Sequence, residues 1–389
     1  MRDYVRGLLA PVARKNSWQP AGQAGHRTPD GLQHFLAGSE WEPDDIIRDG
    51  LQEYVADKLG ENDGVLIIDD TGFVKEGHHL SRGPAPVLRN RRPDRESPRG
   101  GAPSQSGVFA AYAYAFAHGR TLVDRELYLP KSWTEDRERC RTARVLDERE
   151  FAAKGELARH IALRALASPL PIAWVTADSA YGQDNRFRRL LEQSGADYAL
   201  AVPKSQFSAG CSRIAGLFAQ APDEAWEKIS CGNGAKGPRV YHWAAVRLPA
   251  VAEFDYQGEV PHRMRWALAR RSISKPDEIA CYLACTPLRV TVQELVRVAG
   301  ARWAIEECFQ AAKNEYGLDQ YEVRRYVGWY RHITLVMLAH AFLAATAHQV
   351  REKGGRNKWD GRGRRAHGGA VARRCHYLRR CRTIEGRSP

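Results

Sequence analysis

Two short apolar runs, each ending in an aspartate and followed by a turn, constrain the fold of this chain most strongly. The first reads GVLIIDDTG and ends at Asp69 and Asp70, and the second reads PIAWVTADSAYG and ends at Asp178. Each run has the length and composition of a buried strand that emerges into a turn. Parallel strands that end at the same edge of a sheet bring their terminal side chains together. We therefore expect Asp69 and Asp178 to lie close to one another.

A third acid lies on a helix predicted over residues 291–315. On a helical wheel, Arg302, Glu306 and Lys313 form one stripe at the edge of the apolar face. Glu307 points about 100° away from Glu306, toward the polar side. This geometry selects Glu306 as the acid that faces a site. The alternative is a simple ion pair between Arg302 and Glu306, which stabilises a helix by only a few tenths of a kcal/mol.

Three carboxylates on two strand ends and a helix are a suitable donor set for a pair of hard divalent cations. Mg²⁺ prefers oxygen ligands and keeps water and substrate phosphate oxygens in its coordination shell. Two such ions about 4 Å apart can activate a hydroxyl and stabilise the leaving oxygen in phosphoryl transfer. Paired carboxylates also serve glycosidases. The cationic stripe beside Glu306 favours a polyanionic substrate over a sugar.

The rest of the chain divides into regions of different pattern. Residues 1–60 look helical, and they are either a helix-turn-helix-like DNA-binding module or a plain helical packing region. Alternating, strand-like patterns follow between residues 205 and 285. Further elements are expected as strands in VFAAYAYAFAHG and TLVDRELYLP and as helices over 150–167, 183–195 and 329–350.

The net charge of +13 is concentrated in two stretches. Residues 351–389 hold thirteen Lys or Arg and three Asp or Glu, and residues 78–107 hold six Arg and two acids. Neither stretch has hydrophobic periodicity, and both have the composition of disordered or irregular segments. A basic tail can bind nucleic acid, but a solvated tail is the default interpretation.

Several classes of protein are disfavoured by the sequence. No stretch approaches 18 uninterrupted apolar residues, so we expect no membrane span. The first residues lack the apolar core of a secretory signal. Eight scattered cysteines include no C-x-x-C pair, which favours buried, reduced thiols and a cytoplasmic protein.

The motifs together resemble a known family. Arg302, Glu306 and Lys313 match R-x3-E-x6-K, the core of the Y-R-E-K pattern of bacterial insertion-sequence transposases with a DDE triad. The family's tyrosine would fall at Ala299. IIDDTGFVKEG and WVTADSAYG resemble the first and second aspartate motifs of one such group. Further similar segments are LYLPKSW, NGAKGPR and VRRYVGWYRHITLVMLAHAFL. The resemblance covers roughly 1–77 and 108–350.

This resemblance implies an α/β fold with a ribonuclease-H-like mixed sheet flanked by helices. The step of 128 residues from Asp178 to Glu306 is long for that fold, so a β-rich insertion is expected before the catalytic helix. The regions implied are an N-terminal helical region over 1–60, the catalytic core over 61–204 and 286–350, the β-rich insertion over 205–285, and a basic, disordered tail over 351–389.

The resemblance also implies a site and a reaction. Asp69, Asp178 and Glu306 would be the catalytic and metal-binding triad, with Asp70 as second choice for the first acid. Asp69 is preferred because the family places its acid first in D-x-T-G. Arg302 and Lys313 would meet DNA phosphate, although Arg302 could instead orient Glu306.

The reaction implied is DNA cleavage by water at the element's ends, followed by attack of the freed 3′-hydroxyl on target DNA. Mg²⁺ is the expected cofactor, with Mn²⁺ as a substitute. The partners are double-stranded DNA, as terminal inverted repeats and target, and further copies of the chain assembled on it. A bacterial protein of this kind would be cytoplasmic and associated with the nucleoid when bound to DNA.

Residues 78–107 depart from the family and match nothing. We hypothesise that this stretch is out-of-frame translation, in which case a strand next to Asp69 is lost and the enzyme could be inactive. Two alternatives to an active transposase therefore remain: an inactive remnant that only binds DNA, and a metal-dependent nuclease that cuts without joining.

Overall fold

The computed structural model describes residues 1–74, 104–113, 119–207, 213–234, 237–248 and 263–356. The strands are β1 (Gly64–Val74), β2 (Ser104–Ala113), β3 (Arg120–Tyr128), β4 (Ile172–Ala177), β5 (Asp197–Val202), β6 (Glu227–Gly234), β7 (Gly237–Arg247), β8 (Arg263–Arg271) and β9 (Ile279–Pro287). The longer helices are α1 (Arg2–Leu9), α3 (Asp30–Ala37), α5 (Glu53–Leu59), α7 (Arg137–Ala143), α8 (Lys154–Leu166), α10 (Asn185–Gln193), α13 (Val292–Ala301), α14 (Trp303–Tyr316) and α15 (Tyr326–Arg356). The shorter ones are α2 (Trp18–Gln23), α4 (Pro43–Ile46), η1 (Ile47–Gln52), α6 (Lys131–Thr134), α9 (Ser179–Gly182), α11 (Ile214–Ala219) and η2 (Asp223–Ala225).

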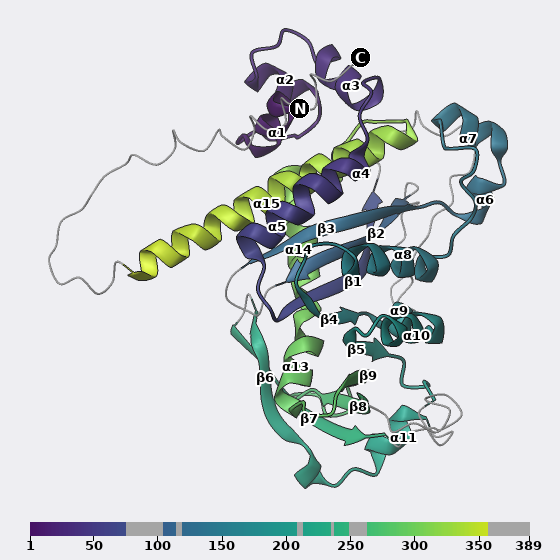
Figure 1. Cartoon of the computed structure of the whole chain (residues 1–389), viewed down its shortest axis with the longest axis vertical. Coiled ribbons are helices and arrows are strands. Elements are labelled where there is room, and N and C mark those ends of the chain that lie inside the picture. The colour runs from purple at the N-terminus through teal and green to yellow at the C-terminus, as the bar shows by residue number, and fades with distance from the viewer. Residues whose placement is uncertain (75–103, 114–118, 208–212, 235–236, 249–262, 357–389) are drawn as a thin grey trace, which may run out of the picture.

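The strands form one mixed sheet with the order β3-β2-β1-β4-β5-β9-β8-β7-β6, and helices lie on both of its faces (Figure 1). β2 pairs with β1 antiparallel, whereas β4 pairs with β1 parallel and β5 pairs with β4 parallel. Residues 65–68 of β1 are almost completely buried, as expected for a strand covered on both faces. This arrangement confirms the predicted ribonuclease-H-like mixed sheet flanked by helices.

β1 continues beyond its acids, which corrects the expectation that the strand ends there. Its parallel ladder with β4 stops at the pair Ile68↔Ala177. Its antiparallel ladder with β2 continues past Asp69↔Phe109 to Val74. The acid therefore lies inside β1, at the point where only one of its two neighbouring strands stops.

A strand lies beside Asp69 and places Phe109 of the predicted strand VFAAYAYAFAHG opposite it. That strand is β2, which begins at Ser104, within the stretch 78–107. The loss of a further strand, expected if the anomalous stretch is frameshifted, stays a prediction. Residues 78–103 of that stretch lie outside the described residues. The frameshift hypothesis itself stays a prediction about the encoding DNA.

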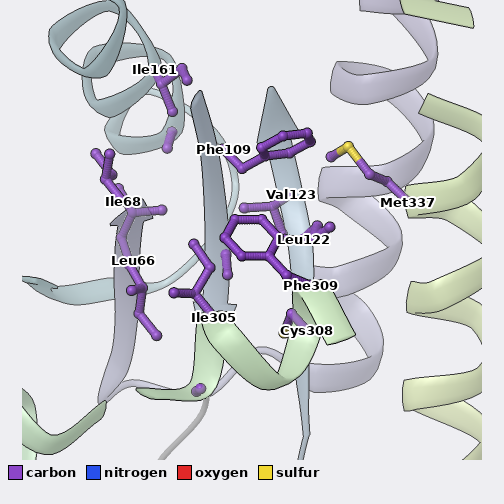
Figure 2. Close-up of a cluster of buried hydrophobic side chains, with 14 of the residues drawn as sticks. Leu66, Ile68, Phe109, Leu122, Val123, Ile161, Ile305, Cys308, Phe309 and Met337 are labelled. Carbon is purple, nitrogen blue, oxygen red and sulfur yellow. The ribbon is translucent and has the colours of Figure 1, made fainter. Parts of the chain in front are cut away.

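In the main core, α14 packs against β1, β2 and β3. Ile305, Cys308 and Phe309 of α14 are buried, and Figure 2 shows them beside Phe109 of β2. The rings of Phe109 and Phe309 meet edge to face with centroids 5.4 Å apart. On the opposite face, α8 packs against β1, β2 and β3, and contributes Ile161 to the core. These contacts fix the helix that carries Glu306 beside β1.

The predicted β-rich insertion extends the main sheet. β9 pairs antiparallel with β5, and β8, β7 and β6 follow outward from it. A separate buried cluster containing Ile214, Phe218 and Trp226 packs on this part. α13 begins at a capping box between Thr291 and Glu294. It packs against β5 and β6 and leads directly into α14 (Figure 1).

The N-terminal helices pack along α15 (Figure 1). Tyr4, Leu36 and Val55 belong to the same buried cluster as the first strands. The Tyr4 hydroxyl also lies 2.7 Å from Nδ1 of His332 on α15. This shared core is the arrangement expected of a helical packing region. A DNA-binding role for residues 1–60 stays a prediction.

α15 is the longest described helix and meets the length and hydropathy of a membrane span over Tyr326–Arg351. More than half of its apolar window is buried against the protein, where it packs on β3, α14 and the N-terminal helices. A core helix has these properties too. The helix also reaches Arg356, so the tail predicted to begin at residue 351 is helical in its first residues. The remainder of that tail lies outside the described residues.

Candidate active site

Asp69 and Asp70 lie on opposite faces of β1, as the alternation of side chains along a strand requires. Oδ2 of Asp69 lies 3.3 Å from Nη1 of Arg302, between α13 and α14. Asp70 forms an ion pair with Nζ of Lys154, at the start of α8. Asp69 therefore faces the helix that carries Glu306, and Asp70 faces α8.

Asp178 directly follows β4 and caps the N-terminus of α9. Its Oδ1 accepts a hydrogen bond of 2.9 Å from the backbone N–H of Ala180. Gly182 ends this short helix against β5, where a Cβ atom would overlap the carbonyl oxygen of Ala201. A larger residue would push α9 off the sheet. The segment DSAYG therefore fixes Asp178 at the carboxyl end of β4.

Arg302 bridges two of the three predicted acids. The helix predicted over 291–315 is in fact two helices, α13 and α14, which meet at this residue. Nη1 of Arg302 lies 3.3 Å from Oδ2 of Asp69 and 3.3 Å from Oε1 of Glu306. The simple ion pair considered above is therefore present, but it also includes Asp69. The Asp69 side chain is 14% exposed and that of Glu306 is 55% exposed.

The charge of Asp178 disfavours ionisation of Asp69. Burial, followed by the negative charge of Asp178, raises the pKa of Asp69 to about 7, although Arg302 acts in the opposite direction. Burial also raises the pKa of Asp178, against the effects of the Ala180 N–H and Arg302. The two carboxyl groups are therefore close enough to repel each other. Any cation placed beside them would favour their ionised forms.

The donor set fits a hard divalent cation in its chemistry. Asp69 and Asp178 offer partly buried carboxylate oxygens whose mutual repulsion a divalent charge would offset. Within the described ranges, no three His, Cys, Asp or Glu side chains are close enough to hold a metal ion together. The guanidinium of Arg302 lies between Asp69 and Glu306. Glu306 can join the aspartates around a cation only if this bridge opens.

The neighbouring charges of α14 have other partners. Glu307 forms ion pairs with Arg120 of β3 and Arg239 of β7. Nζ of Lys313 donates hydrogen bonds of 2.8 Å to the Thr71 hydroxyl and 2.9 Å to the Gly72 carbonyl oxygen. Lys313 thus ties α14 to the second half of β1. A contact between Lys313 and DNA phosphate stays a prediction.

A cluster of aromatic rings and arginines lies next to Arg302, at the start of α14, and the sequence did not predict it. Trp303, next to Arg302, stacks on Tyr241 of β7 with an interplanar angle of 15°. The Arg270 guanidinium lies 4.5 Å from the Tyr241 ring centroid and 4.8 Å from that of Trp303. Arg239 lies 5.0 Å from the Trp303 centroid. We call Arg239, Tyr241, Arg270 and Trp303 the arginine–aromatic cluster. The insertion brings it together from distant segments, so no local motif could have indicated it.

Other residues near the matched motifs have varied surroundings. Tyr181 is 1% exposed and cannot reach a surface ligand as it stands. Lys204 donates a long hydrogen bond of 3.4 Å to the Asp277 carbonyl oxygen. Arg324 is exposed after α14. The Lys154–Asp70 pair was also missed, because the two residues are far apart in sequence.

Comparisons with known proteins show what this chain resembles. A family model described as DDE superfamily endonuclease matches residues 1–208, and one described as Transposase DDE domain matches residues 140–342. The probable transposase for insertion sequence element IS701 from Microchaete diplosiphon is 21% identical over 324 residues, which cover 82% of this chain and 75% of that protein. Among solved structures, a piggyBac transposase synaptic complex with hairpin DNA aligns with 76% of this chain at 10% identity and a TM-score of 0.38. The chain covers 49% of that solved chain, about half its length.

Proposed function

Because this chain belongs to the DDE superfamily of endonucleases and transposases, we propose that it is a transposase that cuts DNA at the ends of an insertion sequence and joins the freed ends to target DNA. One observation carries the proposal. Asp69, Asp178 and the Arg302–Glu306 pair gather at the sheet edge where β4 ends. We propose Asp69, Asp178 and Glu306 as the catalytic acids.

The proposed reaction consists of two phosphoryl transfers. In the first, a water oxygen attacks phosphorus at the element's end, and the 3′ oxygen leaves as a hydroxyl. In the second, that 3′-hydroxyl attacks a target phosphodiester, and the target's own 3′ oxygen leaves. In each step the attacking oxygen loses a proton and the leaving oxygen gains one, so no oxidant or reductant is needed.

The side chains of this site have defined parts in that scheme. Asp69, Asp178 and Glu306 would hold divalent cations, with Mg²⁺ as the expected ion and Mn²⁺ as a substitute. Such cations supply activation of the attacking hydroxyl and stabilisation of the leaving oxygen. Arg302 pairs with Glu306 and Asp69 in the metal-free protein, and its permanent positive charge would be available to a substrate phosphate once that bridge opens.

The surroundings of the acids support DNA as the substrate. The arginine–aromatic cluster presents two guanidinium groups and stacked rings beside Arg302. Arginine and aromatic side chains together suit the phosphates and bases of nucleic acids. We propose that terminal inverted repeats and target DNA bind along this face. Because an element has two ends, at least two copies of the chain would assemble on DNA.

A strand-transfer assay tests the proposal against its alternatives. A labelled, pre-cut inverted-repeat end with a free 3′-hydroxyl is incubated with plasmid, protein and Mg²⁺. A transposase is expected to give labelled plasmid. A nuclease that cuts without joining gives nicked plasmid and no label. An inactive remnant shifts the labelled end on a gel and gives neither product, and either of these last two results would contradict the proposal.

A further inference from the structure

We propose that Asp70, Tyr181 and Lys154 form a clamp that sets the separation of Asp69 and Asp178 and takes no part in binding metal. This inference rests on the proposed function, since it concerns how the two catalytic aspartates are positioned. We call these three residues the Asp70 clamp. They are positioning residues, because none of them touches the reacting atoms in the proposed reaction.

Both carboxylate oxygens of Asp70 are already engaged. Oδ1 accepts a hydrogen bond of 3.1 Å from the Tyr181 hydroxyl. Oδ2 pairs with Nζ of Lys154. The Asp70 side chain is only 10% exposed and lies on the face of β1 away from Arg302. A carboxylate in these surroundings would have to give up a partner before it could bind a cation on the other face.

The clamp lies at the point where the main-chain ladder stops. β1 and β4 are paired up to Ile68↔Ala177, and each chain then continues directly into an acid. Tyr181 follows Asp178 by three residues within the single turn of α9. Its hydroxyl therefore ties the helix that Asp178 caps to the residue next to Asp69. In effect, the side-chain bond continues the connection between the two strands for one more residue.

Lys154 limits the repulsion that Asp70 adds to the two aspartates. The Asp70 carboxylate raises the pKa of both Asp69 and Asp178, and its ion pair with Lys154 of α8 offsets part of that negative charge. The Nζ of Lys154 lies 5.6 Å from the ring centroid of Tyr128, so β3 helps to hold it. Tyr181 is almost completely buried and is itself fixed by the seat of Gly182 on β5. The clamp therefore joins side chains from three elements, β1, α8 and α9.

Calorimetric titration of the whole protein with Mn²⁺ at pH 8, without DNA, tests the clamp. Tyr181→Phe removes only the hydroxyl and is expected to weaken Mn²⁺ binding about tenfold, the usual effect of removing a group that orients a ligand. Asp70→Asn keeps an acceptor for Tyr181 but loses the charge that pairs with Lys154, and it is expected to weaken Mn²⁺ binding by no more than about tenfold, as a positioning group would, without abolishing it. Asp69→Asn is expected to abolish binding.

Tyr198→Phe is the matched control. Tyr198 is also buried and donates a hydrogen bond of 2.6 Å to a carboxylate, that of Glu192, away from the acids. It should lose a similar amount of thermal stability while keeping wild-type Mn²⁺ affinity. If Tyr181→Phe fails to fold, the pair Lys154→Met and Lys154→Arg replaces it, with weakened binding in the first and recovery in the second.

The outcomes separate this inference from the proposed function. The clamp is overturned if Tyr181→Phe keeps wild-type Mn²⁺ affinity, or if Asp70→Asn loses binding while Asp69→Asn retains it. In either case the protein still binds metal. An absence of Mn²⁺ binding by the wild-type protein contradicts the proposed function, and the clamp is rejected with it.

Discussion

Arg302 Nη1 lies 3.3 Å from Asp69 Oδ2, although the two residues are 233 positions apart in the sequence. The same nitrogen lies 3.3 Å from Glu306 Oε1. One guanidinium therefore holds the first strand acid and the helix acid together. Arginine stays charged at any pH at which the protein is folded, so in the metal-free protein Arg302 can pair with Asp69 whenever that acid is ionised.

Removing this bridge should change the acidity of Asp69. Arg302 lowers the pKa of Asp69, so Arg302→Met should raise that pKa above 7. Mn²⁺ binding, which needs the ionised carboxylate, should then begin about one pH unit higher. Calorimetric titrations from pH 6 to 9 measure this shift. Arg297→Met is the control. It removes an arginine of α13 that pairs with Asp63, and it should not shift the profile. An unshifted profile in Arg302→Met would argue against the bridge.

Asp69 should also make the metal-free protein less stable as pH rises. An aspartate in the unfolded chain loses its proton near pH 4, whereas Asp69 in the folded protein keeps its proton until about pH 7. The folded state therefore binds more protons between these values, and its stability falls as pH rises through them. Asp69→Asn should raise the free energy of unfolding by about 2–4 kcal/mol at pH 8 and by almost nothing at pH 4. Urea unfolding in EDTA at both pH values measures the difference, and equal gains at both would contradict the assignment.

Lys313 should contribute to stability, because its two hydrogen bonds hold α14 to β1. Lys313→Met should lower the free energy of unfolding by about 1–2 kcal/mol. The exposed Lys275→Met is the control and should have little effect, since Lys275 pairs with Glu278 and both side chains are exposed. Urea unfolding distinguishes this role from the phosphate contact suggested by the family pattern. If Lys313 serves DNA instead, stability stays unchanged and the salt dependence of DNA binding falls by about one charge.

Gly182 should tolerate no side chain. A Cβ there would overlap the Ala201 carbonyl oxygen, so α9 would have to move off β5. Gly182→Ala should therefore lower the free energy of unfolding by about 2 kcal/mol or more and weaken Mn²⁺ binding by displacing Asp178. Gly216→Ala in α11 is the control, because a Cβ there meets no atom of the described residues within 4 Å. It should be neutral or slightly stabilising. Wild-type stability in both variants would show that α9 is not seated in this way.

The sequence was most informative where the chemistry is local. The two apolar runs predicted β1 and β4 and placed Asp69 and Asp178 near each other, and their electrostatic coupling is consistent with that placement. The wheel separated Glu306 from Glu307, and the structure gives Glu307 separate partners in Arg120 and Arg239. Whether these acids are catalytic stays a prediction until it is measured.

The sequence was least informative where distant segments meet. A helical pattern continues through Arg302, so the change from α13 to α14 there could not be read from periodicity. The length of β1 depends on its antiparallel partner, β2. In the sequence these two strands are separated by a long stretch that has no strand pattern. The arginine–aromatic cluster and the Lys154–Asp70 pair arise only from tertiary packing.

The most direct test of the proposed function is metal-dependent cleavage of a labelled duplex that carries the inverted repeats flanking the gene. The reaction is run with Mg²⁺, with EDTA, and with Asp178→Asn and Glu306→Gln. We predict nicking at the repeat tip that requires Mg²⁺ and falls at least about a thousandfold in both variants, while their affinity for the duplex stays within about threefold of wild type. Cleavage that survives in the variants, or an equal loss of cleavage and DNA binding in them, would contradict a catalytic role for these acids.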